Sequence, residues 1–391
     1  MVAACTTPPA PPPIVMPPPV VTPVPPTVPT PPPVKPPLAP LMTPSTFSAL
    51  PGWNQDDQRE AWQALARSCG VLKRKTEWEA ACLASSSVAG TDLNAVRAYF
   101  EAWFVPHQVR AADGSDSGLV TGYYEPLLLG SRVKSARYGT PLYRVPDDLL
   151  TVDLAGVIPE LKGKRVRGRL SGQKVVPYAT REEIARGSLP GKELLWVDDP
   201  VEAFFLEVQG SGRVQLDSGE TVRVAYGDQN GHPYRAIGRW LVDQGHIPAG
   251  QVSAQAIKAW IAANPQRRQE LFNVNPSYVF FKEERLPDPS VGPKGALGVP
   301  LTPSRSIAVD PSFIPLGAPV YLATTEAGST TPMQRLVMAQ DTGGAIRGEV
   351  RADFFFGFGP QAADNAGRMK QRGNVWVLMP RAQRANVVTT N

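Results

Sequence analysis

The sequence has little of the chemistry from which most metal centres and nucleophilic active sites are built. Its three histidines show no ligand spacing, and its three cysteines, Cys5, Cys69 and Cys82, form no CxxC pair. No metal site is therefore predicted. The chain also has no GxSxG nucleophile motif and no Walker phosphate loop. We expect neither a metal nor a cofactor.

The sequence also lacks long runs of residues with the same charge. The formal net charge is +5, and the lysines and arginines are dispersed, with Lys73-Arg74-Lys75 as one of only two short basic runs. A nucleic-acid-binding protein usually gathers these residues into a stripe. An ordinary solvated surface is favoured, and no nucleic-acid partner is expected. Hydrophobic residues at 42% exclude a wholly disordered chain.

Proline is abundant only near the start of the chain. Of the 43 prolines, 19 lie within residues 8–44, where Lys35 is the single charged residue. Such a segment cannot bury a core and favours a disordered, extended polyproline II tether. At this length the tether reaches on the order of 100 Å.

The residues before the tether, Val2-Ala3-Ala4-Cys5, are typical of the end of a bacterial lipoprotein signal, in which the cysteine becomes lipidated. No charged or apolar signal segment precedes them, so the signal peptide itself is absent from the chain as given. We expect a lipid at Cys5 that holds the folded body near a membrane. The alternative is a free cysteine in a run of small residues.

The first part of the body reads as helical. Amphipathic patterns predict helices over 54–69 and 91–104, the latter capped by Thr91, and a short helix from Thr76 to residue 84. The first and the short helix would form a hairpin that brings Cys69 and Cys82 together. A disulfide is expected if the protein is exported, and two buried free thiols are the alternative.

The rest of the body is mainly β with small helices. Short apolar or alternating runs, among them 119–124, 203–208 and 336–340, recur between Gly, Pro and Asp. Helices are predicted near 233–244, with Pro233 at its first position, near 253–263 and from Pro360. The alternating βαβ rhythm of a parallel sheet is missing.

The densest group of chemistry-bearing residues lies in Ala339-Gln340-Asp341-Thr342-Gly343-Gly344-Ala345-Ile346. Asp341 ends an apolar strand and enters a turn with Gly343 and Gly344. This would hold a carboxyl at the rim of a sheet and let a bulky substrate approach the backbone. Asp353 and Asp364 follow within one compact stretch, which suggests a site built on carboxylates. The alternative for these two is that they tie loops and cap turns.

Asp341-Thr342-Gly343 also opens the aspartic-protease motif. That mechanism needs a second carboxylate that shares a proton with the first, and Asp116 and Asp217 are the nominal candidates. Both lie in polar stretches that resemble turns, and Gly344 departs from the protease motif. An aspartic protease is therefore disfavoured.

Six motifs, in order between about residues 50 and 380, resemble the membrane-bound lytic murein transglycosylase A family. They are GYYEP (122–126), EVQGSG (207–212), YGDQNG (226–231), NPSYVFF (275–281), GALGVPLT (295–302) and AQDTGGAI (339–346). Their number and length argue against a chance match. The lipoprotein-like start fits as well, because the family is anchored to the outer membrane.

The resemblance implies a double-psi β-barrel domain built from both ends of the chain and a smaller β-rich, substrate-binding domain inserted between them, with a groove between the two. On this sequence the barrel domain takes residues 45–135 and 275–385 and the insert takes 136–274. Residues 1–44 are the tether and 386–391 a tail. The implied location is the periplasmic face of the outer membrane, with a lipid anchor at Cys5. Peptidoglycan glycan strands and other wall-remodelling proteins are the implied partners.

The implied reaction cleaves the β-1,4 bond between N-acetylmuramic acid and N-acetylglucosamine. The muramic C6 hydroxyl attacks its own C1 and leaves a 1,6-anhydro end, so one acid suffices where a hydrolase typically needs two carboxylates. Asp341 is the implied catalytic residue, first as acid and then as base, accompanied by Asp353 and Asp364. Its pKa should be raised by a partly apolar setting.

Substrate contacts are expected from Tyr123, Tyr124 and Glu125 on the barrel side, from Gly343 and Gly344 beside the acid, and from a polar turn of the insert. That turn holds Gln209, Ser211 and Gly212. Ordinary turn or core packing is the alternative for each side chain. Two other functions stay open on the same scaffold, a true glycoside hydrolase and a non-catalytic cell-wall binding module.

Overall fold

The computed structural model describes residues 41–161, 164, 166–187, 189–286 and 288–381. The expected tether, apart from residues 41–44, lies outside these residues, and so do Cys5 and the tail 386–391. Within the described ranges, no helix has both the length and the apolar run that crossing a bilayer requires.

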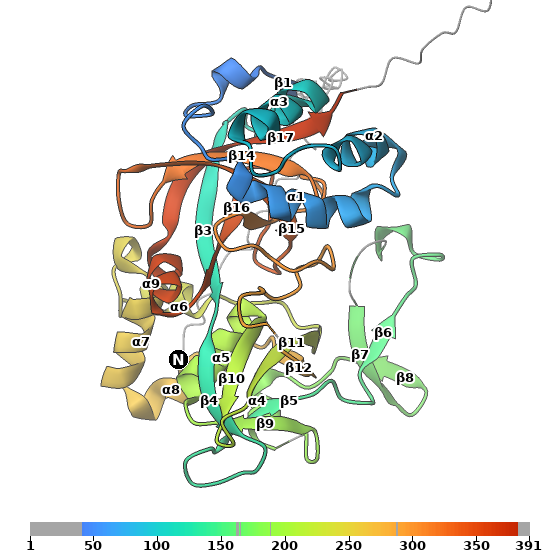
Figure 1. Ribbon diagram of the computed structural model, residues 1–391. Helices are drawn as coiled ribbons and strands as arrows, with labels where there is room; N and C mark the ends of the chain where they lie inside the picture. Colours follow the sequence, from blue (N-terminus) through green and yellow to red (C-terminus); the bar gives the residue numbers. More distant parts are fainter. Residues whose placement is uncertain (1–40, 162–163, 165, 188, 287, 382–391) are drawn as a thin grey trace, which may run out of the picture. The chain divides into compact units, whose positions relative to one another are not determined.

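The elements are labelled in Figure 1. The helices are α1 (Arg59–Leu72), α2 (Thr76–Ser85), α3 (Leu93–Trp103), α4 (Arg181–Ala185), α5 (Pro200–Gln209), α6 (Ile237–Asp243), α7 (Ala254–Ala263), α8 (Arg268–Asn273) and α9 (Pro360–Arg368). The strands are β1 (Met42–Pro44), β2 (Phe104–Val109), β3 (Ser117–Glu125), β4 (Leu127–Ser131), β5 (Thr140–Tyr143), β6 (Leu150–Val152), β7 (Val166–Ser171), β8 (Lys174–Val176), β9 (Glu193–Val197), β10 (Ser211–Leu216), β11 (Thr221–Gln229), β12 (Val279–Glu284), β13 (Ser306–Val309), β14 (Pro319–Thr325), β15 (Pro332–Asp341), β16 (Arg351–Phe358) and β17 (Lys370–Pro380).

The larger sheet closes on itself. Its strand order is β1-β2-β17-β14-β15-β13-β16-β3, and β3 pairs with β17 as well as with β16. The six strands β17, β14, β15, β13, β16 and β3 therefore form a closed ring. Closure leaves no unpaired edge within the ring. The fold is strand-rich, as expected.

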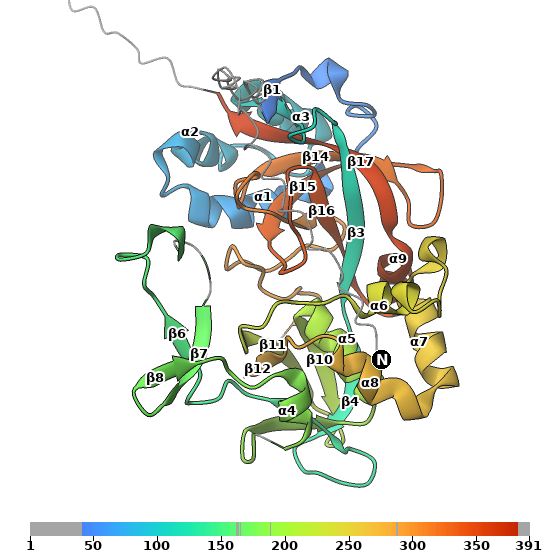
Figure 2. The same ribbon diagram turned by 180° about the vertical axis from the view of Figure 1, so that it is seen from behind.

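A second sheet has the strand order β12-β11-β10-β4-β9-β5 and is connected to the ring through the end of β3. The chain leaves the ring at the end of β3, passes through Pro126 and continues directly as β4. It returns after β12. Strands β6, β7 and β8 make a separate small sheet. Both ribbon views place α9, at the end of the ring, beside α7 (Figures 1 and 2), where Gln255 donates to the backbone oxygen of Asp364.

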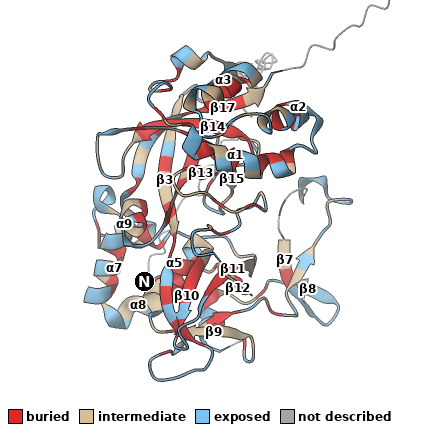
Figure 3. Cartoon of the chain, viewed as in Figure 1, coloured by how far each residue is buried: buried red, intermediate tan, exposed pale blue. Residues whose placement is uncertain are grey.

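Helices α1, α2 and α3 pack against the ring and complete its core. On α1, Ala61, Leu65 and Leu72 are buried at a helical spacing, so that one face of the helix lies against the strands. Figure 3 shows this division of α1 into a buried and a more exposed face. The helix expected at 54–69 begins later, at Arg59, and the expected start of α2 at Thr76 is confirmed.

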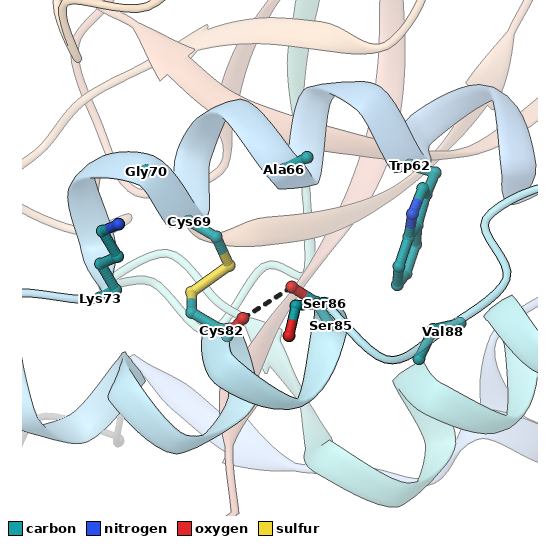
Figure 4. A pocket seen from close by; sticks show the side chains of 9 residues that line it. All are labelled: Trp62, Ala66, Cys69, Gly70, Lys73, Cys82, Ser85, Ser86 and Val88. Atoms are coloured by element: carbon teal, nitrogen blue, oxygen red, sulfur yellow. Dashed lines mark hydrogen bonds between the residues drawn. A yellow bond between two sulfur atoms is a disulfide. The ribbon is translucent and has the colours of Figure 1, made fainter.

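The hairpin of α1 and α2 joins Cys69 to Cys82 (Figure 4). The two sulfur atoms are bonded at 2.09 Å, and the Cα atoms are 5.2 Å apart. Of the two alternatives that the sequence left open, the structure has the disulfide. The bond links two helices that also share the core of the ring.

The stretch 203–208, expected as a strand, is helical and belongs to α5. The Asp199 side chain caps this helix by accepting hydrogen bonds from two backbone amides, and Pro200 stands at its first position. The helix is buried on two sides: Leu206 packs with the second sheet, whereas Phe204 packs with the helices α6 to α8. Because both sides are apolar, the helical period is hidden in the sequence.

Two smaller expectations about helix starts also change. The helix expected from Pro233 begins at Ile237, and the N-cap of α3 is Asp92 rather than Thr91, because the Asp92 carboxylate accepts from two amides of the first turn. The helix expected from Pro360 begins there. Ser211 and Gly212, expected in a turn, open strand β10.

Candidate functional site

Asp341 lies at the end of β15, as the sequence predicted, and at the same level as three residues of neighbouring strands. Ala308 of β13 is paired with Asp341 on one side and with Asp353 of β16 on the other. Asp353 is in turn paired with Thr121 of β3. Paired residues of adjacent strands project to the same face of a sheet. The ring thus assembles two carboxylates and a threonine hydroxyl on one row from three strands, with Ala308 of a fourth strand between the two carboxylates.

The Asp341 carboxylate is held in place by three donors. The Tyr123 hydroxyl donates to Oδ2 at 3.0 Å. The backbone amides of Ala296 and Thr342 both donate to Oδ1 at 2.9 Å. Side chains fixed in this way keep one orientation, which is what a proton-transfer group requires.

Apolar side chains surround the partly buried Asp341. Tyr123, Leu301, Ala308, Ile346 and Phe355 form a small cluster of their own beside it, and the Tyr123 and Phe355 rings are 5.1 Å apart. Burial raises the pKa of Asp341 to about 6, against the three hydrogen bonds that favour the charged form, and the charge of Asp353 adds to the rise. The raised pKa expected from the sequence is present.

Asp353 is the second carboxylate of the row. Its Oδ1 accepts a hydrogen bond from the Thr121 hydroxyl at 2.5 Å, and the Arg351 guanidinium donates to the same hydroxyl at 2.8 Å. Burial raises the pKa of Asp353, whereas the Thr121 hydrogen bond and the charge of Arg351 lower it. Asp353 acts on the Asp341 carboxylate through its charge.

Asp364, the third expected acid, is placed differently. It lies on α9, where its exposed carboxylate pairs with Arg368 one turn later. This is the loop- and helix-stabilising alternative noted from the sequence, and the structure does not bring the Asp364 carboxylate into the row of Asp341 and Asp353. Elsewhere in the described ranges, no cluster of three His, Cys, Asp or Glu side chains could hold a metal ion.

A loop over residues 293–302 covers the carboxylate from one side and depends on a glycine. A side chain at Gly295 would put its Cβ 2.5 Å from the Gln340 carbonyl oxygen and 3.2 Å from the Asp341 Cβ. The missing side chain lets the loop approach closely enough for the Ala296 amide to reach Asp341. Gly344 on the other side faces open space, so the backbone there is accessible. The expected substrate contacts at Gly343 and Gly344 stay predictions.

The back of the site rests on α1, through residues that the sequence did not single out. The Gln340 side chain is fully buried and donates to the Ala64 carbonyl and to the Ser68 hydroxyl at 2.8 and 3.0 Å. Arg67 of α1 donates to the Thr302 hydroxyl at 2.9 Å and so fixes the covering loop. The sequence signal that could have identified this contact is the polar Gln340 within the otherwise apolar run of β15.

Glu125 does not present its carboxylate to a substrate in this structure. The side chain is completely buried and accepts hydrogen bonds from Arg213 and Arg223 at 2.8 and 2.6 Å. Both arginines also donate to the Val291 carbonyl, on the segment that returns to the ring. The expected sugar contact is therefore replaced by an ion cluster where the chain passes between the two sheets.

The remaining expected contact residues lie near this crossing. The Gln209 side chain, at the end of α5, accepts a hydrogen bond from the Tyr124 backbone amide at 3.0 Å. Gly212 is packed so tightly that a Cβ would lie 2.4 Å from a Leu206 methyl carbon. Gln209 and Tyr124 thus join α5 to β3. Contacts of Tyr124, Gln209, Ser211 and Gly212 with a substrate stay predictions.

Two family models match the chain. One describes the MltA specific insert domain and matches residues 119–282; the other describes the 3D domain and matches 305–379. The second match holds the row of carboxylates on β15 and β16. The first contains the whole second sheet, apart from the last residues of β12.

Known lytic transglycosylases resemble the chain along most of its length. Membrane-bound lytic murein transglycosylase A of Escherichia coli is 33% identical over 309 residues, which cover 76% of this chain and 75% of that protein. The structure of a lytic transglycosylase, LtgG, of Burkholderia pseudomallei is 48% identical, with a TM-score of 0.59 over 88% of this chain and 96% of that chain. The structure of E. coli MltA with bound chitohexaose is 27% identical, with a TM-score of 0.64 over 82% and 90%.

These matches and the site define an enzyme of the lytic transglycosylase class. The chain belongs to the membrane-bound lytic murein transglycosylase A family. The resemblance carried by the six sequence motifs is confirmed.

Proposed function

We propose that this enzyme cleaves the β-1,4 bond between N-acetylmuramic acid and N-acetylglucosamine in peptidoglycan and leaves a 1,6-anhydromuramic end. The observation that carries the proposal is Asp341, a firmly held carboxyl in a partly apolar site whose pKa is raised to about 6. At pH 7 a group with this pKa is protonated in about a tenth of the molecules, whereas an ordinary aspartate is protonated in roughly 0.1%. Asp341 is thus available as a general acid at neutral pH.

The proposed reaction returns Asp341 to its starting state without water. The Asp341 proton goes to the glycosidic oxygen, and the bond between that oxygen and the muramic C1 breaks. The muramic C6 oxygen then bonds to C1, and its proton goes to the Asp341 carboxylate. Because the nucleophile belongs to the substrate, it is already near the reacting carbon. One carboxylate therefore serves as acid and then as base.

Tyr123 and Asp353 support this carboxylate in the proposed mechanism. The Tyr123 hydroxyl donates to Asp341 Oδ2 and fixes its orientation. A negative charge on Asp353 opposes the loss of the Asp341 proton and helps to keep the acid protonated. Asp364 stabilises α9 through its ion pair with Arg368 and has no role in the proposed proton transfer.

The finer fold and the domain limits are part of the same proposal. The closed ring of six strands supports a double-psi barrel, which the family resemblance implies. The chain changes sheet after Glu125 and again after β12, and both β4 and β12 pair within the second sheet. We place the limits of the inserted domain at these crossings, about ten residues outside the expected 136–274 at each end. A substrate groove between the two domains stays a prediction.

The relatives support the proposed substrate and location. The E. coli relative binds chitohexaose, a chain of N-acetylated sugars, and its name describes a membrane-bound enzyme. For this protein we propose peptidoglycan glycan strands as substrate. We also propose a lipid anchor at Cys5 on the periplasmic side of the outer membrane, and the proline-rich segment as its tether.

The test is Asp341→Asn with purified sacculi as substrate. The variant should stay folded and lose lytic activity, and the wild-type products should carry anhydro ends, one water lighter than hydrolytic products. Asp217→Asn is the matched control, because Asp217 is exposed and was the nominal partner of an aspartic protease. Products that have gained water would assign a glycoside hydrolase. Lysis by folded Asp341→Asn would contradict the proposed acid.

A further inference from the structure

The outer face of α1 carries a groove that takes no part in the catalytic row. Trp62, Ala66 and Gly70 follow one another at intervals of four residues and therefore lie on one side of the helix, with Lys73 at its end (Figure 4). Ser85 and Ser86, at the end of α2, line the opposite side. We call this cavity of about 400 Å³ the α1–α2 groove.

The space above the floor of the groove is empty because the residues of the floor are small. A Cβ added at Gly70 would meet no atom within 4 Å, so the space above this part of α1 is empty of protein. The Cys69–Cys82 disulfide closes the groove from below and holds its two walls together. A volume of this size lies within the range of small-molecule sites.

The lining offers the groups that recognise a sugar. Trp62 is fixed edge-to-face against Tyr99 at 5.1 Å, and it presents an aromatic surface on which the C–H face of a pyranose ring can stack. The hydroxyls of Ser85 and Ser86 donate to backbone carbonyls at 2.7 Å. Their oxygens keep lone pairs that can accept hydrogen bonds from sugar hydroxyls or from an N-acetyl amide.

The open end of the groove is basic. Lys73, Arg74 and Lys75 are consecutive and exposed, and Lys73 lines the cavity. A ligand with an acidic group at one end of an amphipathic sugar would place that group beside Lys73. The lactyl group of N-acetylmuramic acid is such a carboxylate wherever the peptide has been removed from the strand.

We propose that the α1–α2 groove binds peptidoglycan glycan strands at a site separate from the catalytic carboxylates, with an amino sugar on Trp62 and a muramic carboxylate at Lys73. This proposal rests on the proposed function, because it takes the same polymer as ligand. A strand held at two places on one protein dissociates more slowly than a strand held at one.

The groove is joined to the catalytic row through a single helix. The buried side of α1 receives the Gln340 side chain at Ala64 and Ser68, one residue before Asp341. The groove lies on the opposite side of the same turns of helix. A glycan strand bound in the groove therefore lies on α1, the helix that supports the end of β15 with Asp341.

Filling the groove tests the proposal with little risk to folding. Gly70→Gln places a side chain in the empty space, and Gly70→Ala is the matched control that leaves most of the space open. Both lie in a helix interior, where replacing glycine favours the helix, and circular dichroism checks that both variants fold. Lys73→Gln removes the charge at an exposed position.

Binding is measured by isothermal titration in an Asp341→Asn background, so that the strands are not cut. The probes are soluble glycan strands freed of peptides by an amidase, and chitohexaose, which has no carboxylate. We expect Gly70→Gln to weaken strand binding at least tenfold, Gly70→Ala to leave it unchanged, and Lys73→Gln to weaken binding of the strands but not of chitohexaose. Equal strand affinity of the Gln and Ala variants, or no effect of Lys73→Gln, would overturn the proposal.

A failure of the groove can be told apart from a failure of the proposed function. With Asp341 intact, Gly70→Gln should release anhydro products from a short, peptide-free tetrasaccharide of the glycan strand at the wild-type kcat. If the wild-type enzyme releases no anhydro product from sacculi, the proposed function is wrong. If it does so, and the filled groove changes no affinity, only the second binding site is wrong.

Discussion

Asp341→Asn should make the folded protein more stable at neutral pH while abolishing its activity. In the folded state burial raises the pKa of Asp341 to about 6 from the ordinary value of 3.8. The folded protein therefore binds the Asp341 proton more tightly than the unfolded chain does. Tighter proton binding adds to the free energy of unfolding at low pH. This contribution is fully present below about pH 3.8 and is lost as the pH rises through about 6.

The size of this effect follows from the difference between the two pKa values. About two pKa units correspond to about 3 kcal/mol at pH 7.5. At pH 4.5 the effect is only about 1 kcal/mol, because this pH lies less than one unit above the pKa of the unfolded chain. Asparagine keeps the contacts without the charge. Its Oδ1 can accept from the Ala296 and Thr342 amides, and its Nδ2 can donate to the Tyr123 hydroxyl, which accepts as well as donates.

The measurement is urea unfolding of the wild type and Asp341→Asn at pH 4.5 and 7.5, with the disulfide kept oxidised. The variant should gain up to about 3 kcal/mol over the wild type at pH 7.5, and the gain should shrink by about 2 kcal/mol at pH 4.5. Asp217→Asn, at an exposed position, should show no such dependence. A gain that is the same at both pH values, or a variant less stable than the wild type at pH 7.5, would refute the reasoning.

Four further outcomes are expected. Tyr123→Phe removes the donor to the Asp341 carboxylate; such a bond is worth about 1.5–3 kcal/mol, so the decline of kcat/KM at high pH should move up by about one to two pH units, and a decline that stays in place contradicts this role. Glu125→Gln leaves two buried guanidinium groups without a counter-charge, so urea unfolding should show a loss of about 3–5 kcal/mol, and a loss below about 1 kcal/mol contradicts the account. Reduction of Cys69–Cys82 should cost about 3 kcal/mol, seen in unfolding with and without dithiothreitol, and unchanged stability would show that the link contributes little. Because Asp341 is the proposed acid, activity should fall above about pH 6 and be unaffected by EDTA; a rate that climbs to pH 9, or that needs a metal, would overturn the mechanism.

Local signals in the sequence were sufficient for several parts of the structure. An apolar run that ends at Asp341 before two glycines predicted a strand end, and β15 ends there. Thr76 and Pro360 predicted helix starts, because cap and first-turn chemistry acts over a few residues. Asp353 was singled out because it follows Asp341 in one compact stretch, and the structure places it in the same row, with Ala308 of β13 between the two.

Interactions between distant segments could not be predicted in this way. Tyr123 and Asp341 are 218 residues apart, and no local pattern says that one donates to the other. Glu125 lies in a motif that suggested sugar binding, yet its charge is used by Arg213 and Arg223 some 90 to 100 residues later. The helix α5 is apolar on two sides, so the periodicity that distinguishes helix from strand is absent.

The site forms late in folding, because its row is built from residues far apart in the sequence: Asp341, Ala308, Asp353 and Thr121. The Thr121 and Asp353 side chains meet across 232 residues of intervening chain, and β17, which pairs with β3, is the last strand described. Contacts of such long range form slowly, because the loop between them must close first. The second sheet and its helices can collapse earlier, within one continuous stretch. A chain that lacks β17 cannot close the ring, so we expect the proposed acid Asp341 to be held in its row only once the whole chain has been made.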